Sequence, residues 1–412
     1  MDDLRATLGA FDPDAPLTAA PDPWDYLPMP GIRPGPSWAM AEMIAAEPAL
    51  GPRVARRVVA DGSAAVVAAA VRDAATSGGR IIVTGCGTSE HAAMGTAAIL
   101  RDAWQRAGLP GWGPISAQAF ELALDPPATG LVIGVSHEGG TTATIDVLRA
   151  SRAAGARTAL LTASAGAPAA AVADLVAATV EMDRSWCHTV GYVSPMIVAA
   201  TVGVVLAGSA PRPTSVGVRL RQGIEAAWAA GSDGSRPAEA IARVVAGASQ
   251  LLVVASGVDR ITARELVLKV EEAAWLPSAA RDLETFLHGH LPATGPDTAV
   301  VVILTERAGL PARAKRARQA LSAAAAVGIR AGAILGADAA ALIPADLTPA
   351  GRIVVPEAPS MPPASASLFG AAGPLQLLTL AVAAGRGTNP DPIRRDDPAY
   401  LRAADLADDP AG

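Results

Sequence analysis

The chain has 412 residues, of which 51% are hydrophobic, and its formal net charge is −6. This length and apolar content can bury a large core and favour two domains. The sequence has no basic block, so neither a nucleic-acid partner nor an anionic membrane surface is indicated. Its two cysteines form no metal pattern and suit a reducing compartment. Because no basic and then apolar leader opens the sequence, we expect a cytoplasmic protein.

The first half of the chain predicts alternating strands and helices. Residues 1–36 are rich in Pro and Asp and are expected to be irregular, and helices are predicted at about 37–48 and 51–77. The apolar run Met196–Ala207 is too short to span a bilayer and indicates a buried helix. Short apolar runs that lead into alanine-rich helices indicate a parallel sheet, with strands at 80–84, 130–135, 158–162 and 177–181.

The same pattern starts again in the second half, after a stretch with Pro, Gly and Ser at both ends. Strands are predicted there at 251–254, 299–304, 332–335 and 352–355. The sequence therefore predicts an α/β fold with two similar halves, each a flavodoxin-like, doubly wound parallel sheet flanked by helices. The expected parts are an irregular N-terminal segment, a first domain, a connecting segment, a second domain and a polar tail, at 1–36, 37–210, 211–235, 236–389 and 390–412.

Two loops of the first half follow strands, where parallel sheets bind their ligands. The loop Gly85–Ser89 follows the strand at 80–84, and the loop Ser136–Thr142 follows the strand at 130–135. Glycines and hydroxyl residues there allow backbone N–H groups to reach an anion. One such loop could hold ordinary turn and cap residues, but two of them in one half favour ligand binding. Neither loop has the spacing of a Walker or dinucleotide motif.

A helix predicted in the second half carries Glu265, Lys269 and Glu272 at i, i+4 and i+7, which places them on one face. Lysine is rare in this chain, where only Lys269 and Lys315 occur although Lys and Arg total 33. The ordinary interpretation of this spacing is a salt bridge on a surface helix. The alternative is a functional amine between two carboxylates.

In their order and spacing these motifs resemble the double sugar isomerase (SIS) domain proteins. The nearest resemblance is to the isomerase half of glucosamine-6-phosphate synthase and to stand-alone amino-sugar phosphate deaminase/isomerases. It extends from about Trp38 to Arg395, and Glu272 and His288 are 16 residues apart (288 − 272), as expected in that family. The motifs are the two loops, the Glu265–Glu272 helix, His288-Gly289 and Gly373–Leu378.

The resemblance implies two tandem SIS domains, a sugar or sugar phosphate ligand, a homodimer, and no metal or organic cofactor. Glu272 would move a proton between C1 and C2 through an enediol, and His288, supplied across the dimer interface, would open the ring. Lys269 and Glu265 would lie near the sugar. The hydroxyls of Ser89, Ser136 and Thr141 would hold the phosphate. The substrate-binding candidates in the two loops are Gly87, Thr88, Ser89, Ser136, His137, Glu138 and Thr141.

The chain also departs from the family's pattern. The N-terminal glutaminase cysteine of the synthase has no counterpart, so glutamine is not expected as the nitrogen source within this chain. The C-terminal lysine is absent, and Arg394 could replace its charge but not form a Schiff base. Glu138 replaces a phosphate-binding serine, which opposes an anion unless a nearby cation offsets it. The cations available are His137, Arg184 and His188.

Three functions therefore remain open. The first is an isomerase or deaminase/isomerase for an amino-sugar or keto-sugar phosphate. The second is an enzyme of the same fold that acts on a non-phosphorylated sugar, and the third is a sugar-sensing binding protein. The combination of Glu272 with His288 favours an enzyme, although His288 could also be a structural histidine.

Overall fold

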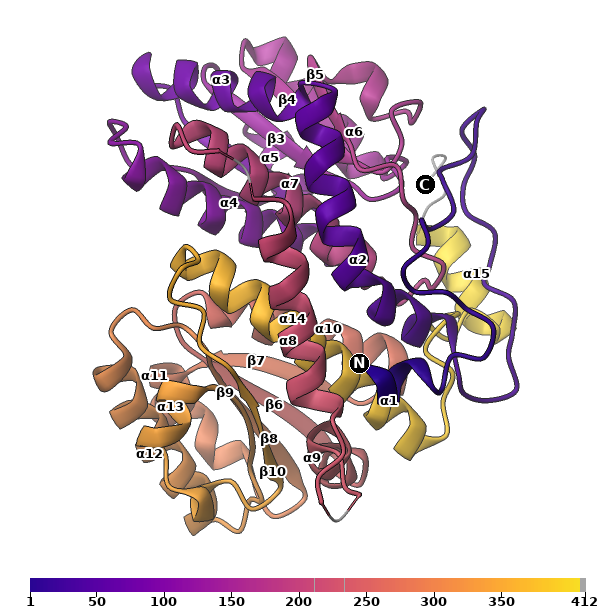
Figure 1. Cartoon of the computed structure of the whole chain (residues 1–412), viewed down its shortest axis with the longest axis vertical. Helices are drawn as coiled ribbons and strands as arrows, with labels where there is room; N and C mark the ends of the chain where they lie inside the picture. Colours follow the sequence, from indigo (N-terminus) through magenta and orange to yellow (C-terminus); the bar gives the residue numbers. More distant parts are fainter. Residues whose placement is uncertain (211, 233, 408–412) are drawn as a thin grey trace.

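Two parallel five-stranded sheets form the frame of the molecule, one in each half of the chain (Figure 1). The computed structural model describes residues 1–210, 212–232 and 234–407. The first sheet has the order β2-β1-β3-β4-β5 and the second has the order β10-β9-β8-β6-β7. When strands are counted within their own half, both orders become 2-1-3-4-5, which is the doubly wound arrangement that the sequence predicted.

The predicted strands of both sheets are confirmed, and two further strands are present. The apolar central strands β1, β3, β8 and β9 are buried along their whole length, as expected for a sheet covered on both faces. The strands are β1 Ile81–Gly85, β2 Ile115–Gln118, β3 Leu131–Val135, β4 Arg157–Thr162, β5 Leu175–Ala178, β6 Gln250–Ala255, β7 Ser278–Asp282, β8 Thr298–Leu304, β9 Gly332–Gly336 and β10 Gly351–Val355.

The strands that the sequence pattern missed are β2 and β7, which occupy the same edge position in the two sheets. Both are only partly buried and carry polar side chains, so they lack the apolar run that marks a central strand. The strand predicted at 177–181 is shifted. It begins at Leu175 and ends at Ala178, and the chain then turns at Val180, whose φ is 74°.

Helices cover both faces of each sheet and fill the space between the halves (Figure 1). Shorter helical turns occur at Ala170–Val172, Phe286–His290, Leu291–Ala293 and Ala345–Leu347. The helices are α1 Asp2–Arg5, α2 Ala39–Ala60, α3 Ser63–Thr76, α4 Thr88–Arg106, α5 Ala119–Leu124, α6 Thr142–Ala154, α7 Val190–Leu206, α8 Thr214–Trp228, α9 Pro237–Ala246, α10 Asp259–Ala274, α11 Leu283–Thr285, α12 Leu310–Ala326, α13 Ala337–Leu342, α14 Pro363–Arg386 and α15 Pro398–Ala407.

The break between the first two long helices is not where the sequence placed it. Helix α2 continues through Pro48 and Pro52, and the chain turns only at Gly62, whose φ of 79° ends the helical path. Close packing holds the middle of α2 in place, because a Cβ on Gly51 would lie 3.0 Å from the backbone nitrogen of Gly217 in α8. The prolines are therefore accommodated inside one helix.

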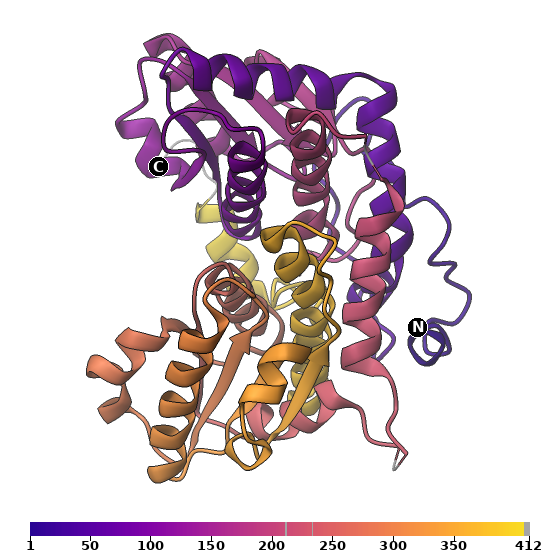
Figure 2. The same cartoon turned by 60° about the vertical axis from the view of Figure 1, so that its left-hand side comes forward.

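Helix α8 fills the centre of the predicted connecting segment 211–235 and packs on α2 and α14 (Figure 2). Residues 211 and 233 of that segment, and residues 408–412 of the predicted tail, lie outside the described residues. The rest of the tail forms a turn and α15. The domain boundaries at these points stay a prediction.

One apolar cluster joins the two halves, with side chains from α2, α4, α7, α8, α10 and α14. Helix α7 is buried along most of its length, as predicted for the apolar run there. Within the described residues one helix, α14, is long and apolar enough to cross a membrane, but 83% of its most apolar window is buried inside the fold. This burial is typical of a core helix.

Candidate active site

Helix α10 packs against both halves and carries a row of charged residues. The side chain of Lys269 is 0% exposed, and its Nζ lies 2.5 Å from Oε2 of Glu272 and 3.8 Å from Oε1 of Glu265. The predicted single face is therefore confirmed. A salt bridge on a surface helix is excluded, because Lys269 and Glu265 are fully buried and only Glu272 is partly exposed, at 22%.

The row holds its lysine in the charged form. Burial alone would lower the pKa of Lys269, but Glu272, Cys187 and Glu265 outweigh it and raise that pKa above its usual value. Burial raises the pKa of Glu272, and Lys269 counteracts part of this rise. Lys269 is thus a fixed cation rather than an amine that exchanges its proton, and Glu272 is a carboxylate of increased basicity beside it.

The two predicted ligand loops lie at the C-terminal ends of the paired strands β1 and β3. The sheet continues from β1 to β2 on one side and from β3 to β4 and β5 on the other. The two loops therefore meet at the topological switch point of the sheet, where doubly wound folds bind ligands. In the first loop Gly87 has a φ of 55° and leads directly into α4 at Thr88 and Ser89. The sequence therefore placed this loop correctly.

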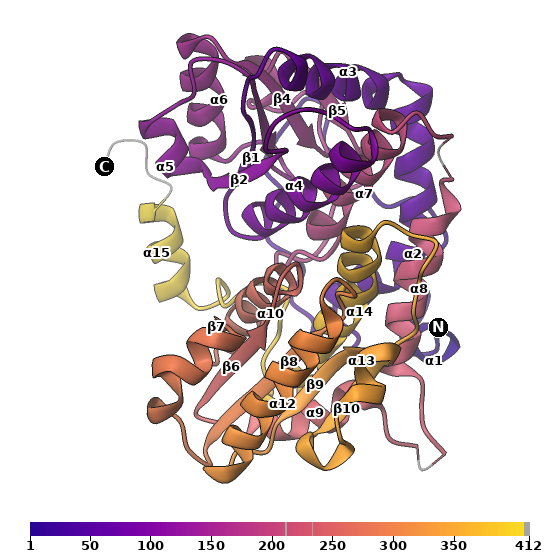
Figure 3. The same ribbon diagram turned by 90° about the vertical axis from the view of Figure 1, so that its left-hand side faces the viewer.

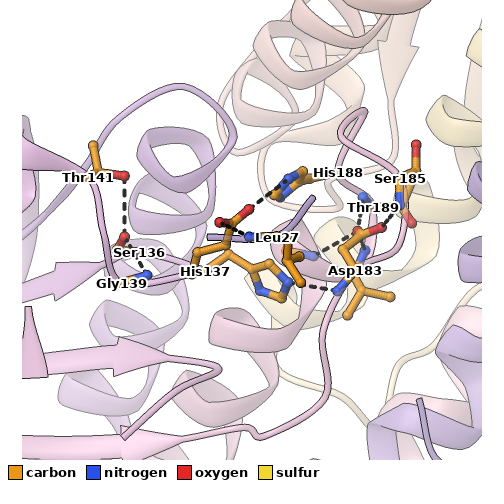
Figure 4. A network of polar contacts seen from close by, with 12 residues as sticks. Leu27, Ser136, His137, Gly139, Thr141, Asp183, Ser185, His188 and Thr189 are labelled. Carbon is orange, nitrogen blue, oxygen red and sulfur yellow. Dashed lines mark hydrogen bonds and ion pairs between the residues drawn. The ribbon is translucent and has the colours of Figure 1, made fainter. Parts of the chain in front are cut away.

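The second loop is held by its own side chains. Ser136 Oγ accepts a hydrogen bond from the Gly139 nitrogen at 3.2 Å and contacts the Thr141 hydroxyl at 3.4 Å (Figure 4). Gly139 has a φ of 81°, and a Cβ there would lie 2.3 Å from the Cβ of Ala167. Glycine is therefore required at this position both by the backbone conformation and by the lack of space.

Two histidines that the sequence offered as cations are neutral. His137 is buried and its Nε2 accepts a hydrogen bond from the Asp183 nitrogen at 2.9 Å (Figure 4). Burial and the neighbouring His188 lower the pKa of His137 to about 3. Burial and the charge of Lys269 lower the pKa of His188 to about 3 as well. The third candidate, Arg184, pairs with Glu42 at 3.3 Å instead of facing the loop.

The segment 183–189 lies between α10 and the second loop and contacts both of them. His188 Nε2 lies 4.0 Å from the Glu138 carboxylate, and its ring packs edge-on against His137 with centroids 5.3 Å apart. Cys187, beside it, is buried against the backbone of Lys269. The segment itself is fixed by the buried carboxylate of Asp183, which accepts backbone hydrogen bonds at the start of α7.

The N-terminal segment also reaches the second loop, which the sequence did not predict. Trp24 Nε1 donates to the Glu138 carbonyl at 2.9 Å, and the Tyr26 hydroxyl donates to the Gly140 carbonyl at 3.3 Å. The Leu27 nitrogen lies 3.5 Å from the Glu138 carboxylate, whose pKa is raised by burial. Two aromatic residues close together, in a chain with only 3% aromatic residues, were the signal available in the sequence.

His91 is a second site residue that the sequence did not identify. It lies in the first turn of α4, just after the first loop, and its Nδ1 is 2.7 Å from the Glu265 carboxylate. Glu265 is fully buried, and its carboxylate lies between this ring and the Lys269 amine. The pair connects the loop of the first half to the charged row of the second half.

His288 lies away from this row on a surface turn, Phe286–His290. Its side chain is 72% exposed, and its polar contacts within the described residues are to Glu284 at 3.3 Å and Arg316 at 3.1 Å. A single chain therefore does not bring His288 to Glu272. A histidine that contributes to the site of a second copy must be exposed in the single chain, as His288 is. The ring-opening role of His288 stays a prediction.

Arg394 is held by aromatic side chains at the end of α10. Its guanidinium lies 4.4 Å from the ring centroid of Trp275 and 3.9 Å from that of Tyr400. Trp275 directly follows α10, three residues after Glu272. The tail also contacts the 183–189 segment through the hydrogen bond from the Trp186 nitrogen to the Asp391 carbonyl. The predicted tail residue is thus close to the row, although its charge already faces two rings.

No protein-family model matches the chain. Among curated proteins, the isomerizing glutamine–fructose-6-phosphate aminotransferase of Aeropyrum pernix is 26% identical over 235 residues. The match covers 55% of this chain and 37% of that protein. The chain therefore spans little more than a third of the length of this relative.

Solved structures match over most of the chain. The C-terminal domain of glucosamine-fructose-6-phosphate aminotransferase from Francisella tularensis is 16% identical with a TM-score of 0.71, and the match covers 88% of this chain and 99% of that one. Tagatose-6-phosphate ketose/aldose isomerase from Escherichia coli is 18% identical with a TM-score of 0.66, over 90% and 98% of the two chains. Glucosamine-6-phosphate deaminase from Thermotoga maritima is 17% identical with a TM-score of 0.58, over 76% and 87%.

These likenesses and the two matching sheets identify the fold as two tandem SIS domains. The chain therefore has the fold of a double SIS-domain protein, as the sequence motifs predicted.

Proposed function

We propose that the chain is an aldose–ketose isomerase, or a deaminase that also isomerises, acting on an amino-sugar or keto-sugar phosphate through an enediol. The observation that carries this proposal is the row Glu265–Lys269–Glu272, in which Glu272 alone is exposed enough for a ligand to reach. The row lies beside the 183–189 segment and the two loops at the switch point. The matched proteins with isomerase and deaminase names support the same chemistry.

The geometry supports a separate function for each member of the row. Proton transfer between C1 and C2 needs one base that removes a proton from one carbon and returns it to the other. Burial raises the pKa of Glu272, which strengthens it as a base, and the adjacent Lys269 cation keeps it ionised. Glu265 balances the second side of the lysine charge and is itself held by His91. We therefore assign proton transfer to Glu272. Lys269 keeps Glu272 ionised, and Glu265 and His91 hold the lysine in position.

Hydrogen exchange with solvent tests this proposal directly. The chain would be incubated in deuterated water with fructose 6-phosphate, tagatose 6-phosphate and glucosamine 6-phosphate, and with the corresponding sugars. We expect deuterium to enter C1 or C2 of at least one of the phosphates, as followed by proton NMR. If a sugar binds and raises the melting temperature while none exchanges its hydrogens, the chain is a sugar-sensing protein instead.

The second expected result concerns assembly. If His288 completes the site of a second copy, the active form is a homodimer. Neither Glu272→Gln nor His288→Ala subunits should then be active alone, whereas a mixture should regain activity, because mixed dimers contain one intact site. The measurement is exchange activity of separate and mixed subunits. A monomer in sedimentation that is fully active would contradict the shared site.

A non-phosphorylated sugar is a second candidate substrate, and one observation favours it. The Glu138 carboxylate lies in the second loop, and the neighbouring His137 and His188, whose pKa values are lowered to about 3, do not offset its charge. Arg395 offsets it in part, but burial still raises the pKa of Glu138. A fixed anion about 4 Å from a phosphate oxygen costs on the order of 1 kcal/mol in water and several times more when buried. A carboxylate there could instead accept hydrogen bonds from sugar hydroxyls.

Replacing Glu138 with serine separates the two candidates. If the substrate is phosphorylated, Glu138→Ser should strengthen binding of a sugar 6-phosphate several-fold and leave turnover in place, because a repelling charge is removed. If the substrate is a free sugar, the same change should weaken its binding. Calorimetric titration of the sugar and its 6-phosphate measures both, with Glu121→Ser on the exposed helix α5 as a control. Equal affinities in the parent and in Glu138→Ser would show that Glu138 does not contact the ligand.

A further inference from the structure

A cavity of about 910 Å³ opens between the two halves, beside the N-terminal part of α10. Residues of α4 and β2 line one side of it, and residues of α10, β7 and the turn after β7 line the other. Figure 3 shows that α4 belongs to the first half and that α10 and β7 belong to the second. None of the candidate site residues from the sequence lines it. Its size is within the range of small-molecule sites, and its position between domains is typical of them.

Four arginines line this cavity. Arg101 comes from α4, Arg260 and Arg264 lie one turn apart on α10, and Arg281 comes from β7. His290 lies at the same opening. Arginine side chains from three elements thus line one space, and this concentration of positive charge attracts anions.

Three of the four arginines have a carboxylate nearby, which is Glu90 for Arg264, Asp282 for Arg260 and Asp102 for Arg101. Within the described residues, the one ion pair that any of them makes is between Arg264 and Glu90, at 3.9 Å. Arg101 donates to the carbonyl of Pro114, which is neutral. Arg281 donates to the carbonyl of Ala280, and its Nε is buried without a hydrogen-bond partner.

The two acidic residues that line the cavity offset part of its positive charge. Asp282 accepts hydrogen bonds from the backbone nitrogen and the hydroxyl of Thr285, at 2.8 and 2.6 Å, although it also lies close enough to Arg260 to interact with its charge. Glu306 accepts from the Val258 nitrogen at 2.6 Å and pairs with Arg313. Four arginines and two carboxylates line the cavity, and one of these carboxylates pairs with Arg313, so the lining keeps a net positive charge.

We propose that this interdomain cavity is a binding site for a small anion that carries two or more phosphate groups. Guanidinium groups match phosphate oxygens in pairs of hydrogen bonds, so several of them from different elements favour more than one phosphate. Such a ligand would contact α4 and α10 together, and these helices carry the first loop and the charged row. The ion pair between Arg264 of α10 and Glu90 of α4 also links these two helices. Binding would therefore hold the two halves in one relative position, which is the geometry of an effector site.

Calorimetry with inorganic pyrophosphate tests the site without relying on enzyme activity. The parent chain should bind pyrophosphate saturably, more weakly at higher salt, and more tightly than orthophosphate. The double variant Arg260→Gln/Arg281→Gln should bind it at least tenfold more weakly. The matched control is Arg106→Gln/Arg149→Gln, which removes two positive charges from surface positions outside the cavity. ADP and fructose 1,6-bisphosphate then distinguish a nucleotide from a sugar source of the phosphates.

The outcomes are separable from those of the proposed function. Pyrophosphate that binds the phosphate loops would be retained in the Arg260→Gln/Arg281→Gln variant, whereas binding in the cavity would be lost. The proposal is overturned if the parent shows no saturable binding or if both double variants lose the same affinity. It is also overturned if the Arg260→Gln/Arg281→Gln change alters sedimentation but not pyrophosphate binding, because a second copy would then cover the cavity. Melting curves of each variant check folding, and the single change at the exposed Arg260 replaces the double if needed.

Discussion

A Glu272→Gln chain should exchange the C1 or C2 hydrogen of its substrate about 10²- to 10⁴-fold more slowly than the parent, with its fold intact. The amide keeps the shape of the side chain but cannot accept and return a proton. The carboxylate that it replaces is partly exposed, has a pKa raised by burial, and lies 2.5 Å from the Lys269 amine. Its neighbours Glu265 and Lys269 are fully buried, so no other group of the row can take its place.

Glu271→Gln is the matched control for this change. Glu271 is adjacent in sequence but exposed, and its carboxylate accepts a hydrogen bond from the Ser278 nitrogen on another face of α10. Its loss should leave exchange within about twofold of the parent, because it is no part of the row. Exchange is measured in deuterated water by NMR, and folding by circular dichroism. Unchanged exchange in Glu272→Gln would exclude the proton-transfer role and leave the fold assignment intact.

The sequence predicted those parts of the molecule that local periodicity determines. The apolar runs of the central strands, such as β3 and β8, are long enough to be recognised, and the row on α10 follows directly from helical geometry. The half-exposed edge strands β2 and β7 carry no such pattern, and only pairing to a neighbour defines them. The position of the switch point depends on the strand order, which is determined by pairing between segments that are distant in the sequence.

Contacts between distant segments determine the rest of the site. His91 and Glu265 are 174 residues apart, and Trp24 and Glu138 are 114 apart, so neither contact has a local signature. The charge states of His137 and His188 could not be predicted from the sequence either, because they depend mainly on burial. Glu138 could be recognised as unusual from its position in the loop, but the neutral state of the two histidines beside it depends on the fold.

Replacing Lys269 with methionine should lower the free energy of unfolding by about 3–5 kcal/mol, the cost of leaving a buried charge without its partner. Methionine fills the same space without a charge. Glu265 and Glu272 would then face each other without the cation between them, and one oxygen of Glu265 is already buried with no hydrogen-bond partner. Lys315→Met is the control, since Lys315 lies exposed on α12, and its loss should cost about 0.5 kcal/mol or less. Urea unfolding measures both variants.

The pH dependence of the Lys269→Met variant shows whether the loss is electrostatic. Burial already raises the pKa of Glu272 in the parent, and removing the lysine should raise it further. A carboxyl group with a raised pKa in the folded state binds more protons there than in the unfolded chain. The folded state therefore gains stability relative to the unfolded chain as the pH falls. The deficit should therefore be largest at neutral pH and shrink as the pH falls through the raised pKa towards the usual glutamate value. A second change, Glu272→Gln, should restore part of the loss at neutral pH, because it removes one of the unpaired charges. A deficit that is independent of pH and unaffected by Glu272→Gln would instead mean that Lys269 stabilises the fold through packing alone.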